Sequence, residues 1–170
     1  LFAPDDTGYF LNIAAGNDAS DLSWQKDTTG DVNLAGPSGN TVLSSFGAGA
    51  PTIDDNNYDK FRMTFLRTRN GMSLGAEYSH NQSTPPVTLT AGDTSSPITS
   101  FDRVLAGLGN HPIDHWHDDV RLERNDGPDY VANGDFEQGN TGFESNYTFQ
   151  NTGPGGGEYG IVTNPNDWFS

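Results

Sequence analysis

The sequence contains no cysteine, which excludes disulfide bonds, thiolate zinc sites and a thiol nucleophile. It also lacks any run of about 18 apolar residues, so no segment is predicted to span a membrane. Basic residues are scarce, with 8 Lys and Arg against 23 Asp and Glu, and the formal net charge is −15. Because this charge would repel phosphate groups, we exclude nucleic acid as a partner.

The residues that are abundant favour turns, loops and an aromatic core. The chain has 21 Gly and 10 Pro, together with ten Phe, six Tyr and three Trp side chains. Of the acidic residues, 18 are Asp and 5 are Glu. Short carboxylates in loops are typical of calcium sites, although they also occur simply as a solvated acidic surface.

Apolar residues alternate with polar ones with a period of two, and no stretch has a helical period. This pattern predicts an all-β fold with antiparallel sheets. The predicted strands are residues 9–15, 22–26, 41–46, 58–69, 72–78, 87–90, 98–108 and 117–123.

The strongest local pattern is a hairpin around Asn70-Gly71, the pair that best accepts a type I′ turn. A two-residue loop there predicts that Phe65 faces Ala76 and that Met63 faces Tyr78. One face of the hairpin is then apolar and the other mostly polar, with Arg62 and Glu77 placed diagonally on the polar face.

Two turn signals fall between residues 124 and 128, where the sequence reads Arg-Asn-Asp-Gly-Pro. They predict a first domain over residues 1–127, and a linker followed by a β-rich segment over residues 128–170.

Residues 58–123 resemble the C-terminal half of concanavalin A-like (laminin G-like) β-sandwich modules of secreted bacterial proteins. The features that carry the resemblance are the hairpin, the run over residues 94–104 and a closing strand that contains Asp118-Asp119-Val120. The resemblance implies a jelly-roll sandwich, a location outside the cell or at its surface, and a calcium-binding role for Asp118 or Asp119.

The segment Asn133-Gly134-Asp135-Phe136-Glu137 is similar to the opening of galactose-binding-like carbohydrate-binding jelly rolls. This similarity implies that Glu137 contributes to a structural calcium site. From these two resemblances we expect that neither sandwich has all its strands within the sequence, and three explanations stay open. The chain is a fragment, or a neighbouring subunit supplies the missing strands, or residues 133–170 fold back to supply them.

Histidines and tryptophans are the other candidate ligand-binding residues. On a strand, His115 and His117 share one face with Asp119, an arrangement that suits a divalent transition metal; the alternative is a solvated loop-to-strand junction. We expect Trp24, Trp116 and Trp168 to stack on sugar rings if the chain binds polysaccharide, the alternative being that they belong to the core.

No catalytic pattern is convincing. Asp5-Asp6-Thr7-Gly8 contains the tripeptide of aspartic proteases in a single copy, and no paired carboxylates or Gly-x-Ser-x-Gly elbow occur. We therefore expect a non-catalytic extracellular structural or adhesive module, stabilised by calcium, whose partners are copies of itself or neighbouring modules. The alternative is a carbohydrate-binding module of a polysaccharide-degrading enzyme.

Overall fold

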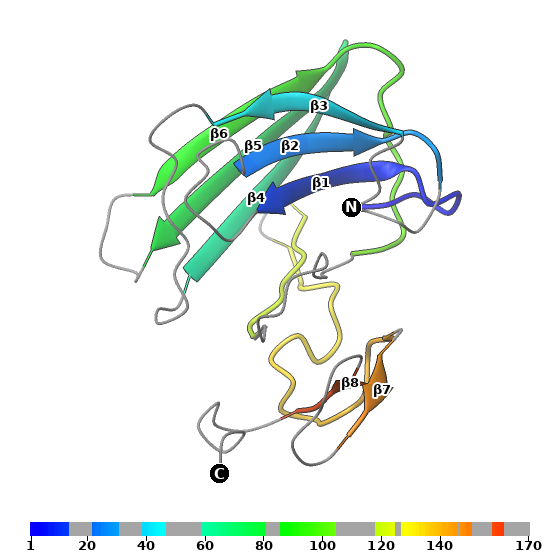
Figure 1. Cartoon of the computed structure of the whole chain (residues 1–170), viewed down its shortest axis with the longest axis vertical. Helices are drawn as coiled ribbons and strands as arrows, with labels where there is room; N and C mark the ends of the chain where they lie inside the picture. Colours follow the sequence, from blue (N-terminus) through cyan, green and yellow to red (C-terminus); the bar gives the residue numbers. More distant parts are fainter. Residues whose placement is uncertain are drawn as a thin grey trace. The chain divides into compact units, whose positions relative to one another are not determined.

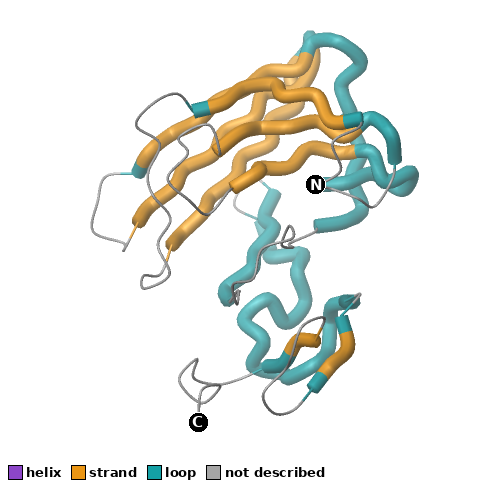
Figure 2. The backbone as a smooth tube through the Cα atoms, viewed as in Figure 1, coloured by secondary structure: helices purple, strands orange, loops and turns teal. Residues whose placement is uncertain are grey.

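A computed structural model of the chain describes residues 1–13, 22–30, 39–46, 59–80, 86–104, 118–124, 127–145, 147–150 and 158–161. Within these ranges every regular element is a β-strand (Figures 1 and 2), so none of them contains a helix that could cross a membrane. The chain divides into two compact units, Leu1–Gly109 and Asn110–Ser170. The domain boundary expected after residue 127 stays a prediction.

The first sheet of the N-terminal unit consists of β1 (Gly8–Ile13), β2 (Leu22–Asp27) and β3 (Asn40–Ser45), in the order β1-β2-β3. Both pairings are antiparallel, and a bulge interrupts the register between β2 and β3 after Trp24. The strands predicted at residues 9–15, 22–26 and 41–46 are confirmed, except that residues 14 and 15 lie outside the described ranges.

The second sheet consists of β4 (Asp59–Thr68), β5 (Gly71–His80) and β6 (Val87–Asp93), in the order β4-β5-β6. It is also antiparallel throughout, as expected for strands joined by short connections. The antiparallel all-β fold and the predicted hairpin are therefore confirmed. In Figure 1 the two sheets lie face to face, as in a β-sandwich.

The predicted register of the hairpin is wrong by two residues. Phe65 pairs with Leu74 and Met63 with Ala76, so the loop residues are Arg69 and Asn70. Neither has a positive φ, whereas Gly71 belongs to β5, where a Cβ atom would collide with the Asp93 carbonyl oxygen. The glycine is thus required by the close approach of β6, and not by a type I′ turn. Because side chains alternate with a period of two, the predicted apolar and polar faces are unaffected.

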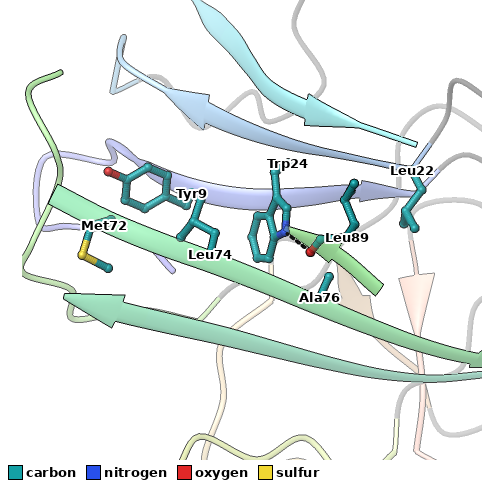
Figure 3. Close-up of a cluster of buried hydrophobic side chains, with 7 residues drawn as sticks. All are labelled: Tyr9, Leu22, Trp24, Met72, Leu74, Ala76 and Leu89. Carbon is teal, nitrogen blue, oxygen red and sulfur yellow. Dashed lines mark hydrogen bonds between the residues drawn. The ribbon is translucent and has the colours of Figure 1, made fainter. Parts of the chain in front are cut away.

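A core of seven buried side chains lies between the two sheets (Figure 3). Tyr9, Leu22 and Trp24 come from the first sheet, and the second contributes Met72, Leu74, Ala76 and Leu89. The Trp24 ring packs edge-on against Phe65, with centroids 5.4 Å apart. Its indole N–H donates to the Leu89 carbonyl at 3.3 Å, so the one polar atom of this buried side chain is satisfied.

Two predicted strands are absent in their described parts. Residues 98–104 form only an isolated bridge, between Arg103 and Phe2, and the Ile98 N–H donates to the Tyr9 hydroxyl instead of to a neighbouring strand. Residues 118–123 contain one bridge, from Glu123 to Asp129. Asp119 has a φ of 52°, which is incompatible with an extended strand.

In the described part of the C-terminal unit, regular structure is limited to β7 (Thr148–Phe149) and β8 (Glu158–Tyr159), a short parallel pair. Aromatic rings pack against one another in this unit: Phe143 contacts Phe136 and Tyr159, at centroid distances of 5.3 and 5.9 Å, and Phe149 also contacts Tyr159. The Asn133 side chain organises the loop that follows it by donating to the Gly139 and Thr141 carbonyls.

Candidate functional site

The three tryptophans proposed for sugar stacking have different outcomes. Trp24 is fully buried in the core between the sheets, where its ring faces are covered by protein and cannot reach a sugar. Trp116 and Trp168 lie outside the described residues, as do His115 and His117. The assignment of Trp24 to the core was the alternative considered from the sequence.

The acidic residues predicted to bind calcium are exposed in the C-terminal unit. Asp118 accepts the Asp119 N–H at 2.8 Å, and the Asp119 carboxylate lies 3.4 Å from the Arg121 guanidinium. Glu137 has no ion-pair partner among the described residues. In those same ranges no three acidic or histidine side chains gather closely enough to hold a metal ion.

A shallow depression of about 190 Å³ lies beside Asp119 in the same unit. Its polar lining comprises Asp119, Arg121, Asp129, Asn133, Asp135 and Gln138. Hydrogen bonds from the Val131 and Leu122 N–H groups, at 2.9 and 3.0 Å, lower the pKa of Asp129. The depression therefore combines an ionised carboxylate with hydrogen-bonding side chains, which suits a polar ligand.

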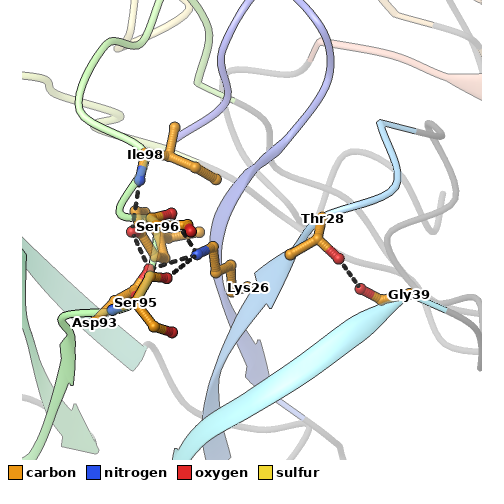
Figure 4. A network of polar contacts seen from close by, with 8 residues as sticks. Lys26, Thr28, Gly39, Asp93, Ser95, Ser96 and Ile98 are labelled. Atoms are coloured by element: carbon orange, nitrogen blue, oxygen red, sulfur yellow. Dashed lines mark hydrogen bonds and ion pairs between the residues drawn. The ribbon is translucent and has the colours of Figure 1, made fainter.

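A buried polar network connects the two sheets at one end of the sandwich (Figure 4). The Lys26 ammonium lies 2.7 Å from the Asp93 carboxylate and donates to the Ser95 and Ser96 carbonyls. The Tyr9 hydroxyl donates to Asp93 at 2.7 Å and accepts the Ile98 N–H. Each charged group in the network thus has an opposite charge or several hydrogen bonds, as buried charges require.

The pKa values in this network follow from burial and hydrogen bonding. Burial would raise the pKa of Asp93, but hydrogen bonds from Lys26, Tyr9 and the Ser95 N–H outweigh it and lower the pKa. Burial, together with the neighbouring Asp93 carboxylate, raises the pKa of Tyr9. Asp93 therefore stays ionised and Tyr9 stays neutral near pH 7. Because the groups of the network are bonded to one another, the network is suited to a structural role.

Asp27 is a second buried acid among the described residues, and no pattern in the sequence predicted its burial. It is fully buried at the end of β2, and its Oδ1 accepts both the N–H and the hydroxyl of Thr29 at 2.8 Å. Its Oδ2 is equally buried and has no hydrogen-bond partner within the described ranges. An unpartnered buried carboxylate oxygen is costly, so this atom is a candidate ligand for a cation or an ordered water.

Two of the exposed apolar side chains in the described part of the N-terminal unit lie on β4, an outer strand of its sheet (Figure 1). In the described chain β4 pairs only with β5, so its other edge presents unpaired N–H and C=O groups. Met63 is 47% exposed although it lies on the core-facing side, and Leu66, on the opposite face, is 58% exposed. Such an edge can accept a further strand.

The other outer strands, β1, β3 and β6, present less free edge for an added strand than β4 does. The β1 edge is partly covered, because Phe2 bridges to both Gly8 and Arg103. β3 and β6 are shorter than the ten-residue β4, with six and seven residues. The hairpin was identifiable from the sequence, but the exposed outer edge follows only from the order of strands in the sheet.

Comparisons with known proteins add no assignment. No family model matches the sequence, and neither the curated proteins nor the solved structures include a significant match to the chain.

Proposed function

We propose that the chain is a non-catalytic structural or adhesive module of an extracellular assembly at a bacterial surface. Its sandwich is of the jelly-roll type found in concanavalin A-like modules, and a strand from a neighbouring subunit completes it. The observation that carries this proposal is the free edge of β4, with Met63 and Leu66 exposed along it. The structural role of the buried Tyr9, Lys26 and Asp93 network is consistent with a module that binds rather than catalyses.

Strand addition at this edge would satisfy two requirements at once. The incoming backbone would pair with the free N–H and C=O groups of β4, and its side chains would cover Met63 on the core-facing side. Burying exposed apolar surface contributes roughly 25 cal/mol per Å² removed from water. The interface would then extend both the hydrogen-bonded sheet and the core.

Self-association of the full chain tests this function. Met63→Asp places a charge on the apolar side of the edge and is expected to weaken association about tenfold or more, as measured by sedimentation velocity and electron microscopy. The matched control is Val42→Asp, which changes a residue that is 58% exposed on β3. A wild-type chain that stays monomeric at high concentration, or equal effects of the two substitutions, would contradict the proposal.

Calcium stabilisation is part of the same proposal. The expected ligands Asp118, Asp119 and Glu137 are exposed and thus accessible to the ion. Asp27 offers a different kind of support, since its Oδ2 is buried without a partner and a bound cation would satisfy it. Calcium bound to the folded chain alone would raise the melting temperature.

Carbohydrate binding is a second candidate, favoured by one exposed aromatic side chain. Tyr130 is 62% exposed and lies between Asp129 and Val131, both of which line the polar depression. A sugar ring stacked on Tyr130 would place its hydroxyl groups near the polar side chains that line the depression. Retention on insoluble polysaccharide that is lost in Tyr130→Ala, and kept in Tyr147→Ala, would support this alternative over the structural one.

A further inference from the structure

The free edge of β4 is also the most basic part of an acidic molecule. Four of the eight basic residues, Lys60, Arg62, Arg67 and Arg69, fall within ten positions on β4 and its turn. All four are exposed. Arg62 lies 4.0 Å from Glu77, while in the described part of the chain Lys60, Arg67 and Arg69 have no ion-pair partner.

This charge opposes pairing of β4 with the β4 strand of a second copy. In such a symmetric pair, each strand would place its three cations and one acid alongside the same set of charges on the other strand. Like charges on adjacent strands are destabilising, and basic residues on edge strands commonly prevent self-pairing. The same edge would attract an extended segment that carries acidic side chains.

Acidic side chains are concentrated in the other unit of the chain. Residues 110–170 contain eleven acidic and two basic residues, a net charge of −9, whereas residues 1–109 have a net charge of −6. In the described part of the C-terminal unit, Glu123, Glu137 and Glu144 are exposed and have no ion-pair partner there.

We propose that the β4 edge binds an extended acidic segment from residues 110–170 of a neighbouring copy. This inference rests on the proposed assembly function and names the two surfaces that meet. Because the surfaces differ, the contact is heterologous, and each copy offers one of each. Repetition of a heterologous contact that does not close into a ring produces a linear filament.

Charge-neutralised variants of the full chain test the pairing. The edge variant combines Lys60→Gln with Arg67→Gln, leaving the Arg62–Glu77 pair in place. The acid variant combines Glu123→Gln, Glu137→Gln and Glu144→Gln. The control combines Arg121→Gln with Arg124→Gln, which removes the same number of cations outside β4. Sedimentation velocity in chelator, at fixed ionic strength, measures association, and circular dichroism melting confirms that each variant folds.

We expect the edge variant to associate at least about tenfold more weakly than wild type, the acid variant also to be weakened, and the control to be unimpaired. An equimolar mixture of the edge and acid variants should form 1:1 dimers and nothing larger, because it contains only one intact edge and one intact acidic segment per pair. This capped dimer is the decisive expected result.

Three outcomes would overturn the inference. An edge variant that associates as tightly as wild type or more tightly would indicate β4-to-β4 pairing or another interface. An unaffected acid variant would exclude residues 110–170 as the partner. A monomeric wild-type chain would remove the proposed function as well, whereas in the first two cases assembly itself would still stand.

Discussion

At the scale of single residues, the sandwich depends on a few buried polar groups that no sequence pattern predicts. Lys26 and Asp93 are 67 positions apart in the chain, yet they form a buried ion pair of 2.7 Å. No local motif links them, and only the packing of one sheet on the other brings them together. Trp24 was ambiguous from the sequence for the same reason, because burial of its ring depends on the facing sheet.

Asp93 should make stability depend on pH in the acid range. Its pKa is lower in the folded chain than in the unfolded chain, so its stabilising contribution is complete above about pH 4 and is lost as the pH falls through the folded value. Asp93→Asn should cost about 3–5 kcal/mol at pH 7, since it leaves the Lys26 charge buried. Urea denaturation should also show a smaller loss of stability below about pH 4 in the variant than in wild type. Identical acid dependence in the two proteins would contradict the assignment.

Substitution of Asp27 tests whether calcium binds at its buried carboxylate. If its unpartnered Oδ2 binds the ion, millimolar calcium should raise the melting temperature of wild type, and a chelator should reverse the effect. Asp27→Asn should abolish the increase, while Asp118→Asn should preserve it. Loss of the increase in Asp118→Asn alone would place the ion in the C-terminal unit, and no increase in wild type would end the calcium proposal.

At the scale of elements, alternation with a period of two was sufficient to predict the hairpin and its two faces. Register was harder, because Asn70-Gly71 suggested a turn that the chain does not use. Residues 98–104 have strand-like composition, but their backbone groups bond to the Tyr9 hydroxyl and to Phe2. These contacts join segments about 90 to 100 positions apart. A local sequence pattern cannot predict them.

The observed register predicts different outcomes for the two turn residues. Gly71→Ala should destabilise the chain by about 1–3 kcal/mol, because the new Cβ would collide with the Asp93 carbonyl oxygen. Asn70→Ala should have little effect, since Asn70 does not have a positive φ. Thermal denaturation of the two variants compares them directly. A type I′ turn centred on Asn70-Gly71 would instead make both substitutions costly.

At the scale of the whole molecule, order is unevenly distributed between the units. The N-terminal unit has two three-stranded sheets around a buried core, whereas the described regular structure of the C-terminal unit is one pair of two-residue strands. Local stability follows the density of buried contacts and backbone ladders. The acidic C-terminal unit is therefore the better source of a segment that extends along another molecule.

Hydrogen exchange measured by mass spectrometry should reveal this difference. We expect the slowest exchange in β2 and β5, the central strands of the two sheets, because each is paired on both sides. Residues 127–145 should exchange at least about tenfold faster, since their described backbone bonds are turns and isolated bridges. Equal protection in residues 127–145 and in β5 would contradict the expected division of stability.

The hydrogen bond from Tyr9 to Asp93 also has a consequence for folding kinetics. It joins residues 84 positions apart, whereas β4, β5 and β6 follow one another in the chain and can pair by closing short loops. The entropy lost in closing a loop increases with its length, and contacts between distant residues slow folding. The meander should therefore form before the first sheet docks on it, and the Tyr9–Asp93 bond should form after the rate-limiting step. Removing this bond would then accelerate unfolding while leaving the refolding rate nearly unchanged.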